Sequence, residues 1–343
     1  MDKKRKDLYN HRVSISGLNL LARSPRAYKQ YIENPRDEES EALRKGSALD
    51  CMLTEPDKFD ERFAVADITP PGGMMGEFVR VFLSSSTNAI NEQDQEAFEE
   101  ALKTAYNASG FKTKYETVIK KFEAPEVQDY ILFVLGSKDK TILSPNEWAS
   151  ALGMKEMLLN NEFTKKYLVD LPALPTIEVH DQLKIEWKHG EFECISILDK
   201  VIVDHAKKEI IPIDIKTTSK GVGNFVQSYL RFGYFRQCSF YISAIKYWLH
   251  NISEIKNPDE WSIAKFHFIV VDSNLNDFPL IYTVSDQDIE VGRNGGALPN
   301  SSMIVTGWAN LLDSLTFHQK ERDWRYTQEQ FEKHGKLELN IFM

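Results

Sequence analysis

The sequence predicts an α/β protein with a central mixed β-sheet, flanking helices and a large helical insertion. Strand-like alternation occurs in the second half of the chain, at 176–187, 195–204 and 209–218. Helical periodicity surrounds these strands, and a further run of helices without strands fills about residues 67–175. The order helix, three-strand meander, helix, strand is typical of an α/β core with a mixed sheet.

Composition excludes several classes of protein. A chain of 343 residues with 42% hydrophobic and 27% charged residues is typical of a globular protein with a substantial core. The net charge of −9 argues against non-specific coating of nucleic acid, which depends on Lys and Arg. The three cysteines lie far apart without CxxC spacing, so we expect no disulfide framework, zinc knuckle or iron–sulfur cluster. No apolar run suits a membrane span, and the expected location is the cytoplasm.

The expected amino-terminal region, 1–66, is helical and includes the first helix of the core. Residues 13–35 read as two short helices, with Ser16 as the N-cap of the first and Ser24-Pro25 opening the second. Residues 37–56 read as one amphipathic helix, in which Asp50 is the odd member of an otherwise apolar stripe. The small residues 46–48 make this helix thin, so another backbone can approach it closely.

The expected helical insertion covers 67–175, and the core sheet with the carboxyl-terminal helices covers 176–343. A breaker at 69–73 opens the insertion, and three segments within it read as helices: 93–106, 124–135 and 144–161. Removing the insertion would bring the helix of Asp50 next to the first strand, at 176–187.

The two strands after 187 form a hairpin whose register places acidic residues together. If 205–208 is the turn, Asp204 pairs with Glu209 and Asp199 lies opposite Asp214, with Lys216 on the same face. Directly opposed side chains lie about 5 Å apart, and like charges there destabilise a sheet. A divalent cation between the two carboxylates removes this objection. The alternative is structural, because an Asp-x-Lys pair on a strand is more often an exposed ion pair.

After the hairpin, a helical stretch at 225–250 is interrupted at Gly233. Gln237 and Tyr241 lie on one stripe of its second half. Two further strands follow at 265–273 and 278–285, and the first is apolar enough to be central. The remainder reads as helical, with packing anchors at Trp308, Phe317 and Trp324.

Several of these segments together resemble the motifs of PD-(D/E)XK nucleases. In chain order they are "GSALD", "ILDKV", "IDIKTT" and "QCSFY". The nearest group is exonuclease VIII (RecE-like), with relatives in the RecB nuclease domain, and the opening "ISGLNLLARSPRAY" is similar to the start of that group. The late "ERDWRY" is similar to its carboxyl-terminal Trp segment. The insertion matches nothing in the family.

The resemblance implies roles for individual residues. Asp199, Asp214 and Lys216 stand at the positions of the catalytic set, with Asp214 where many relatives have Glu. Gln237 and Tyr241 form the "QxxxY" signature that in such enzymes lies along the site and the DNA backbone. Asp50 stands where relatives usually have His, and a carboxylate is a good ligand for Mg²⁺ or Mn²⁺. Relatives also tend to have Arg where this chain has Ile197.

The expected chemistry is hydrolysis assisted by metal ions. Asp50, Asp199 and Asp214, with the backbone carbonyl of Ile215, are expected to hold one or two Mg²⁺ or Mn²⁺ ions that activate water. Lys216 is expected to orient that water or help to deprotonate it, and to offset the charge that builds on the phosphate.

The resemblance also implies a biological setting. It implies a 5′ to 3′ exonuclease on the free ends of double-stranded DNA, in recombination or phage DNA metabolism within a bacterial or phage-infected cytoplasm. It further implies a single-strand annealing partner protein and a homo-oligomer. Two alternatives stay open: an endonuclease or nickase on the same core, and a non-catalytic DNA-binding assembly protein.

Overall fold

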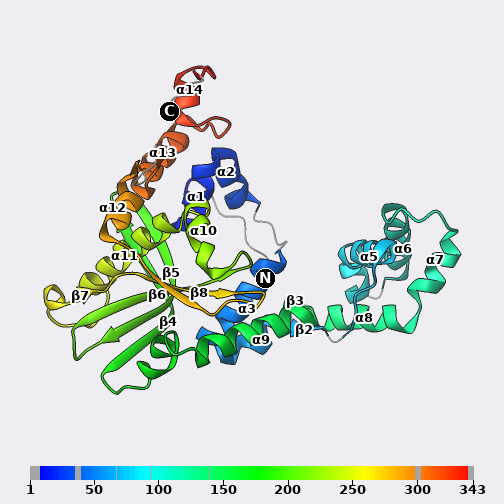
Figure 1. Ribbon diagram of the computed structural model, residues 1–343. Coiled ribbons are helices and arrows are strands. Elements are labelled where there is room, and N and C mark those ends of the chain that lie inside the picture. Colours follow the sequence, from blue (N-terminus) through cyan, green and yellow to red (C-terminus); the bar gives the residue numbers. More distant parts are fainter. Residues whose placement is uncertain are drawn as a thin grey trace. The chain divides into compact units, whose positions relative to one another are not determined.

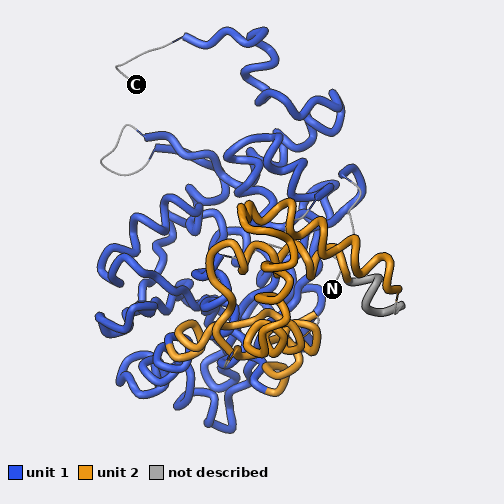
Figure 2. The backbone as a smooth tube through the Cα atoms, turned by 90° about the vertical axis from the view of Figure 1, so that its right-hand side faces the viewer, with its two compact units in different colours: residues 1–56, 150–343 blue, residues 57–149 orange. Residues whose placement is uncertain are grey.

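The computed structural model describes residues 8–34, 40–66, 68–92, 94–137, 139–297 and 303–338, of which 87–92 are described by their backbone alone. The chain forms two compact units, which are coloured separately in Figure 2. Unit 1 consists of residues 1–56 and 150–343, and unit 2 consists of residues 57–149.

Unit 1 is built around a mixed β-sheet (Figure 1). The long hairpin strands pair antiparallel, β6 pairs parallel with β8, and β9 pairs antiparallel with β8 at one edge. The short β1 pairs parallel with β5. The bounds of these strands are β1 Val13–Ser14, β4 Ile177–His189, β5 Phe192–Asp204, β6 Glu209–Thr218, β7 Ser262–Ile263, β8 His267–Asp272 and β9 Leu280–Thr283.

Helices cover both faces of this sheet. On one face, α11 packs against β4 and β5 and contacts α1 and α12. On the opposite face, α3 packs against β5 and β6, as Figure 1 shows. The helices of unit 1 are α1 Ile15–Arg23, α2 Pro25–Glu33, α3 Glu41–Thr54, α10 Phe225–Arg231, α11 Tyr234–Asn251, α12 Asp286–Asn294, α13 Trp308–Glu321 and α14 Gln328–Glu332. The short strands β10 (Gly296–Ala297) and β11 (Ile304–Val305) form a separate pair.

The strands alternate their side chains between two hydrophobic layers, as the period of two requires. Leu198, Val201, Phe268 and Val270 face the layer formed with α11 and α13. That layer includes Trp308, which is fully buried. Trp324 is buried too, while Phe317 is half-buried against Phe331, so the three expected anchors differ in depth.

The hairpin predicted from the sequence is confirmed. β5 and β6 are joined at 205–208, and Asp204 pairs with Glu209. The strand at 267–272 is central, since it lies between β6 and β9. The predicted interruption at Gly233 is also confirmed, because Gly233 adopts a left-handed backbone (φ 69°) between α10 and α11.

The predicted N-cap of the first helix is wrong by two residues. Ser14, not Ser16, caps α1, because its extended backbone (φ −110°) continues strand β1 and its Oγ accepts a hydrogen bond from Gly17 N at 3.3 Å. Ser24 and Pro25 open α2 as expected.

Unit 2 has a hydrophobic core of its own. Phe78 and Phe82 of α5, Ala105 of α6 and Phe122 of α7 pack together in that core. A two-stranded parallel sheet lies in the same unit, with β2 paired to β3. The elements of unit 2 are α4 Phe59–Arg62, β2 Phe63–Val65, α5 Gly73–Glu92, α6 Gln95–Ala108, α7 Tyr115–Phe122, α8 Pro125–Gly136 and β3 Thr141–Leu143.

The unit boundaries lie at 57 and 149, whereas the expected insertion covers 67–175. Residues 63–65 belong to unit 2 because they pair with β3. At the other end, helix α9 (Pro145–Asn160) begins in unit 2 and ends in unit 1. Its second half belongs with the core, because Ser150 Oγ donates to Ser273 O at 2.7 Å and Gly153 lies against Leu275.

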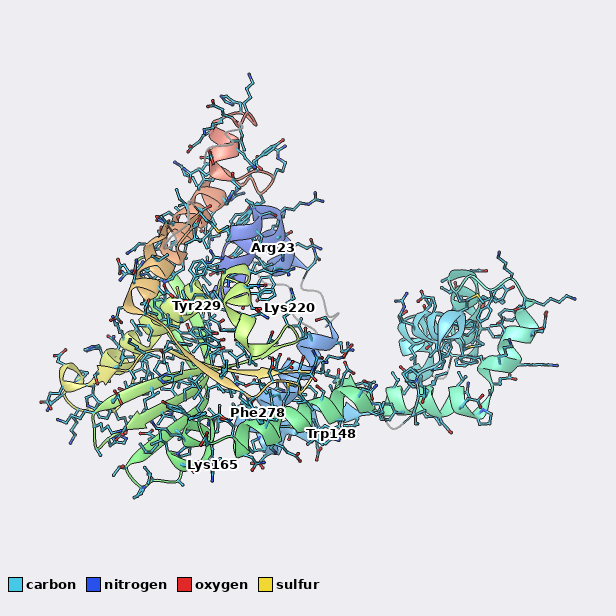
Figure 3. The ribbon with its side chains drawn as sticks, viewed as in Figure 1. Arg23, Trp148, Lys165, Lys220, Tyr229 and Phe278 are labelled. Atoms are coloured by element: carbon cyan, nitrogen blue, oxygen red, sulfur yellow. The ribbon has the colours of Figure 1, made fainter. Side chains whose placement is uncertain are left out.

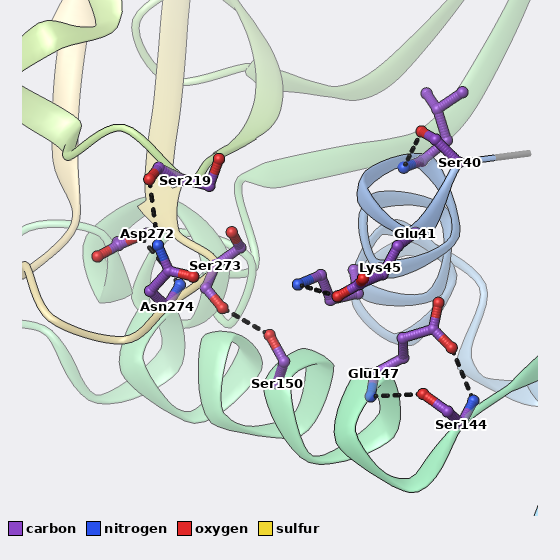
Figure 4. A network of polar contacts seen from close by, with 11 residues as sticks. Ser40, Glu41, Lys45, Ser144, Glu147, Ser150, Ser219, Asp272, Ser273 and Asn274 are labelled. Carbon is purple, nitrogen blue, oxygen red and sulfur yellow. Dashed lines mark hydrogen bonds and ion pairs between the residues drawn. The ribbon is translucent and has the colours of Figure 1, made fainter.

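Polar contacts fix the start of α9 and the loop that follows β8 (Figure 4). At the start of α9, Ser144 and Glu147 cap each other: Ser144 N donates to Glu147 Oε2 at 2.7 Å and Glu147 N donates to Ser144 Oγ at 3.3 Å. In the loop after β8, Asn274 Nδ2 donates to Ser219 O at 3.1 Å, which ties that loop to the end of β6. The carboxyl ends of the two parallel strands are therefore held together.

A hydrogen bond between two side chains anchors helix α10 to α12. Tyr229, labelled in Figure 3, donates a hydrogen bond to Asp288 Oδ2 at 3.1 Å.

None of the helices in the described ranges combines the length and the apolar character that crossing a membrane requires.

We predict that Gly292→Ala lowers the free energy of unfolding by about 1–3 kcal/mol, because overpacking forces a close contact apart. A Cβ at Gly292 would collide with Phe235 O and lie 2.8 Å from Ser239 Cβ, where α12 meets α11. Urea unfolding measures the change. Gly223→Ala is the matched control in unit 1, since nothing lies within 4 Å of its added Cβ. Equal midpoints for the two variants would contradict this packing.

Candidate active site

A cleft of about 280 Å³ opens between helix α3, the middle of β5 and the end of β6. Of the residues expected from the sequence, Asp50, Asp199, Ile215 and Lys216 all line it. They come from positions up to 166 residues apart, as the numbers of Asp50 and Lys216 show. The remaining lining residues are Ala42, Leu43, Gly46, Ser47, Leu49, Thr217 and Tyr234.

The thin segment of α3 allows the approach that its composition predicts. A Cβ at Gly46 would lie 3.5 Å from Thr217 Oγ1 of β6. A larger residue at this position would push α3 outward, which would move Asp50 away from the strands. The small side chains therefore set the width of the cleft.

Asp214 is buried beside the cleft, with 1% of its surface exposed. Asp214 and Lys216 are two residues apart on β6 and share a face, which brings Lys216 Nζ to 2.5 Å from Asp214 Oδ2. From α11, Gln237 Nε2 donates to Asp214 Oδ1 at 2.8 Å. The contact with Lys216 is an ion pair without hydrogen-bond geometry, so Asp214 Oδ2 accepts no hydrogen bond within the described part of the chain.

Asp199 lies where the pairing of β5 and β6 ends. The ladder runs from Asp204↔Glu209 to Lys200↔Ile213 and stops there. Asp199 and Asp214 would be the next pair of that register, but they form no ladder pair. Instead, Asp199 Oδ2 accepts a hydrogen bond from Ile215 N at 2.8 Å. The protein thus supplies an amide and an ammonium to the two neighbouring carboxylates.

Burial and neighbouring charges shift the pKa values of Asp199, Asp214 and Lys216. The pKa of Asp214 is raised to about 7, chiefly by burial. The charge of Lys216 lowers this pKa, and the nearby charge of Asp199 raises it. Burial also raises the pKa of Asp199. Burial alone would lower the pKa of Lys216, but Asp214 and Asp199 raise it above its ordinary value. Each carboxylate therefore gains from a nearby positive charge.

Asp50 is held by a residue that sequence reasoning missed. Gln182 Nε2 donates to Asp50 Oδ2 at 2.9 Å and to Oδ1 at 3.1 Å, and it lies 3.2 Å from Thr54 Oγ1. Gln182 reaches α3 because its backbone is left-handed, with φ 49° in the middle of β4. Such strain in a non-glycine residue costs about 1–2 kcal/mol and persists only where the surroundings enforce it.

Gln182 of β4 lies opposite Asp199 of β5, and both strands depart from regular pairing at this position. The two strands pair at Asp181↔Lys200 and again at Leu183↔Leu198, and the position between them joins Gln182 and Asp199 without a ladder pair. On β5, Leu198 and Val201 face the same core layer although they are three residues apart. Both strands therefore shift their alternation at this point. No signal in the sequence marks it, because Gln182 is not a residue that typically adopts φ > 0.

The expected roles of Gln237 and Tyr241 in DNA contact stay predictions. The structure shows Gln237 bound to Asp214, and it shows Tyr241 buried, with 8% of its surface exposed. Burial raises the pKa of Tyr241, as does the charge of Asp214. In this arrangement Gln237 supports the buried carboxylate.

Tyr234 is a second residue that sequence reasoning missed. Its ring lines the cleft, and Lys216 Nζ lies 5.1 Å from the ring centroid. A lysine over an aromatic face gains about 0.5–2 kcal/mol from the ring's quadrupole. Tyr234 therefore restrains the side chain of Lys216 in addition to Asp214.

The donor set suits a hard cation, although it is incomplete. In the part of the chain that the structure describes, no three His, Cys, Asp or Glu side chains lie close enough to hold a metal ion together. Mg²⁺ commonly uses one or two carboxylates and completes its shell with water and substrate phosphate. Carboxylate and carbonyl oxygens around the cleft match that preference.

We predict that Lys216→Met lowers the free energy of unfolding by about 3 kcal/mol, because it leaves the buried Asp214 without its cation. The double variant Asp214→Asn/Lys216→Met removes both charges, so it recovers most of this loss. Urea unfolding of both variants in EDTA measures the two effects. A double variant as unstable as Lys216→Met would show that the pair is not coupled.

We predict that Gln182→Gly is more stable than Gln182→Met by about 1 kcal/mol, because glycine adopts φ > 0 without strain. Both variants remove the amide that binds Asp50, so the comparison isolates the backbone. Thermal unfolding measures the difference. If the methionine variant is equally stable, the left-handed backbone at 182 is not strained.

Comparisons with known proteins give little further information. No protein-family model matches the chain. No curated protein matches it either. Among solved structures, the chain is similar to a crystal structure described as "Putative exonuclease" from Eubacterium rectale, with 10% identity over 99% of this chain and 94% of that chain and a TM-score of 0.44. At this level of identity and TM-score, the likeness has no bearing on function.

Proposed function

We propose that this protein is a nuclease that uses divalent metal ions to hydrolyse phosphodiester bonds in DNA, on a PD-(D/E)XK core. The observation that supports the proposal is the cleft itself. Asp50, Asp199, Ile215 and Lys216 line one cleft, and Lys216 is in contact with the buried Asp214. A purely structural ion pair has no need of two further carboxylates around the same opening.

The residues fit Mg²⁺ or Mn²⁺. Asp214 Oδ2 is a buried carboxylate oxygen in contact with the Lys216 ammonium, and Asp199 Oδ2 accepts a hydrogen bond from Ile215 N. Asp50 is fixed by Gln182 through both of its oxygens, and it lines the cleft. Asp50, Asp199, Asp214 and the carbonyl of Ile215 are the groups that would hold one or two ions.

A bound divalent ion supplies Lewis acidity, which neutralises phosphate charge and lowers the pKa of water. The protein's own residues supply the rest. Asp214 and Asp199 raise the pKa of Lys216, so it stays an ammonium, which orients the attacking water and offsets the charge that builds on the phosphate. Asp214 and Tyr234 position the Lys216 ammonium, and Gln237 fixes Asp214.

The direction of attack, the kind of DNA end and the partners rest on the family resemblance alone. On that basis we propose a 5′ to 3′ exonuclease on linear double-stranded DNA, in recombination or phage DNA metabolism. A single-strand annealing partner and a homo-oligomer belong to the same proposal. An endonuclease or nickase would use the same cleft, since end-dependence comes from how DNA is threaded.

One assay distinguishes these functions. We expect end-labelled linear duplex to be degraded with Mg²⁺ or Mn²⁺ and to survive in EDTA, while covalently closed circles stay intact. Cutting of the circles would favour the endonuclease. Failure to cut either substrate with any metal would contradict the proposal and favour a DNA-binding protein without catalysis.

We predict that Lys216→Ala lowers the cleavage rate by about 100-fold or more, because positioned acid–base and electrostatic catalysis contribute at least that much. Binding of Mn²⁺, measured by calorimetry, should persist. Lys184→Ala is the control, since this lysine is exposed and pairs only with Glu186 on β4 in the described structure. Equal loss of cleavage in both variants would contradict the role of Lys216.

A further inference from the structure

A group of exposed apolar side chains lies on helix α10 and at the turn that ends it. Val226 is 55% exposed, Leu230 is 38% exposed and Phe232 is 50% exposed. Single apolar residues on a surface need no explanation, but a group that contains a large aromatic ring marks an interaction site more often. Of this group, Phe232 is the residue whose backbone is held by a hydrogen bond from a neighbouring helix.

The backbone of Phe232 is fixed although its ring is exposed. Asn19 Nδ2 of α1 donates to Phe232 O at 3.1 Å, and Phe232 N donates to Ser228 O at 2.9 Å. Asn19 itself is held, because its Oδ1 accepts from Arg236 Nε at 2.7 Å. The left-handed Gly233 then turns the chain into α11. An exposed ring on a fixed backbone is preorganised for binding.

Phe232 is connected to the cleft through one other ring. Its centroid lies 5.7 Å from that of Tyr234, which lines the cleft and lies over Lys216. Tyr234 is also stacked against the buried Phe225, with centroids 5.7 Å apart. Aromatic surface therefore continues from the catalytic lysine to the exterior of α10.

The charge around Phe232 suits an anionic partner. The chain has a net charge of −9, yet residues 215–253 contain no Asp or Glu. Lys220 lies on the loop between β6 and α10 (Figure 3), and Arg231 is exposed with its guanidinium 5.6 Å from the Phe232 ring centroid. Two carboxylates from other elements approach α10, but Asp288 binds Tyr229 and Asp277 binds Val222 N.

From these observations we infer that Phe232 and Arg231 form a binding site for an unpaired nucleotide next to the cleft. The Phe232 ring stacks on the base, and Arg231 contacts the adjoining phosphate. This inference rests on the proposed function and adds a substrate class to it: the strand enters the cleft with at least one base unpaired. Duplex DNA would have to open at this position.

The test is equilibrium binding in EDTA, so that no cleavage occurs. A fluorescein-labelled oligothymidine and a blunt duplex of the same length are titrated with each variant and followed by anisotropy. Phe232→Ala should weaken binding of the single strand about 5- to 100-fold, the range for one lost stacking platform. Phe232→Trp should keep the affinity, and Phe232→Leu should lose it, because stacking needs a ring.

Val226→Ala is the matched control. It removes apolar surface of similar exposure from the same helix, and it should leave single-strand binding within about twofold, because it removes no ring. An equal effect of Phe232→Ala and Val226→Ala would overturn the inference, as would full affinity in Phe232→Leu or no binding by the unaltered chain. The inference would also be overturned if Phe232→Ala weakened binding of the duplex more than binding of the single strand.

The failure of this inference can be told apart from the failure of the proposed function. If the unaltered chain cleaves DNA and binds single strands independently of Phe232, only the inference is wrong. If Phe232 governs single-strand binding but no metal supports cleavage, the nucleotide site stands and the hydrolytic function is wrong.

Discussion

The buried carboxylate of Asp214 is the constraint on which the rest of the structure depends. A charged group in the interior of a sheet is costly unless it is paired and hydrogen-bonded. Lys216 from the same strand and Gln237 from α11 meet this requirement. Because the two partners come from different elements, β6 and α11 must keep their relative positions. The same interactions fix the direction in which Lys216 points, and that direction is toward the cleft.

Around this centre the hairpin departs from regular geometry. The ladder between β5 and β6 ends before Asp199, which releases its side chain to accept a hydrogen bond from Ile215 N. Opposite it, the left-handed Gln182 of β4 holds Asp50 of α3. Strained backbone is found preferentially at functional sites, where surrounding structure enforces it. One irregular point in the sheet thus orients two carboxylates that come from separate elements.

Local patterns in the sequence were sufficient for the parts of the fold that local chemistry decides. The hairpin register followed from its short turn and its alternation, and the break at Gly233 followed from a residue that tolerates a left-handed backbone. The bond between Gln182 and Asp50 could not be predicted, because its partners are 132 residues apart. The helix α9 could be predicted but not divided between units, since its periodicity is the same on both sides of the boundary. The N-cap at Ser14 was missed because strand β1 forms only against β5.

Neighbouring acids persist here without an ion to hold the fold together. Lys216 and the Ile215 amide already offset part of the repulsion, so the proposed cation would serve the proposed hydrolysis more than the folding. The most direct measurement is anomalous diffraction from a crystal grown with Mn²⁺. The account predicts a manganese peak within bonding distance of Asp199 and of Asp50 or Asp214. Clear density for these aspartates with no peak between them would contradict it.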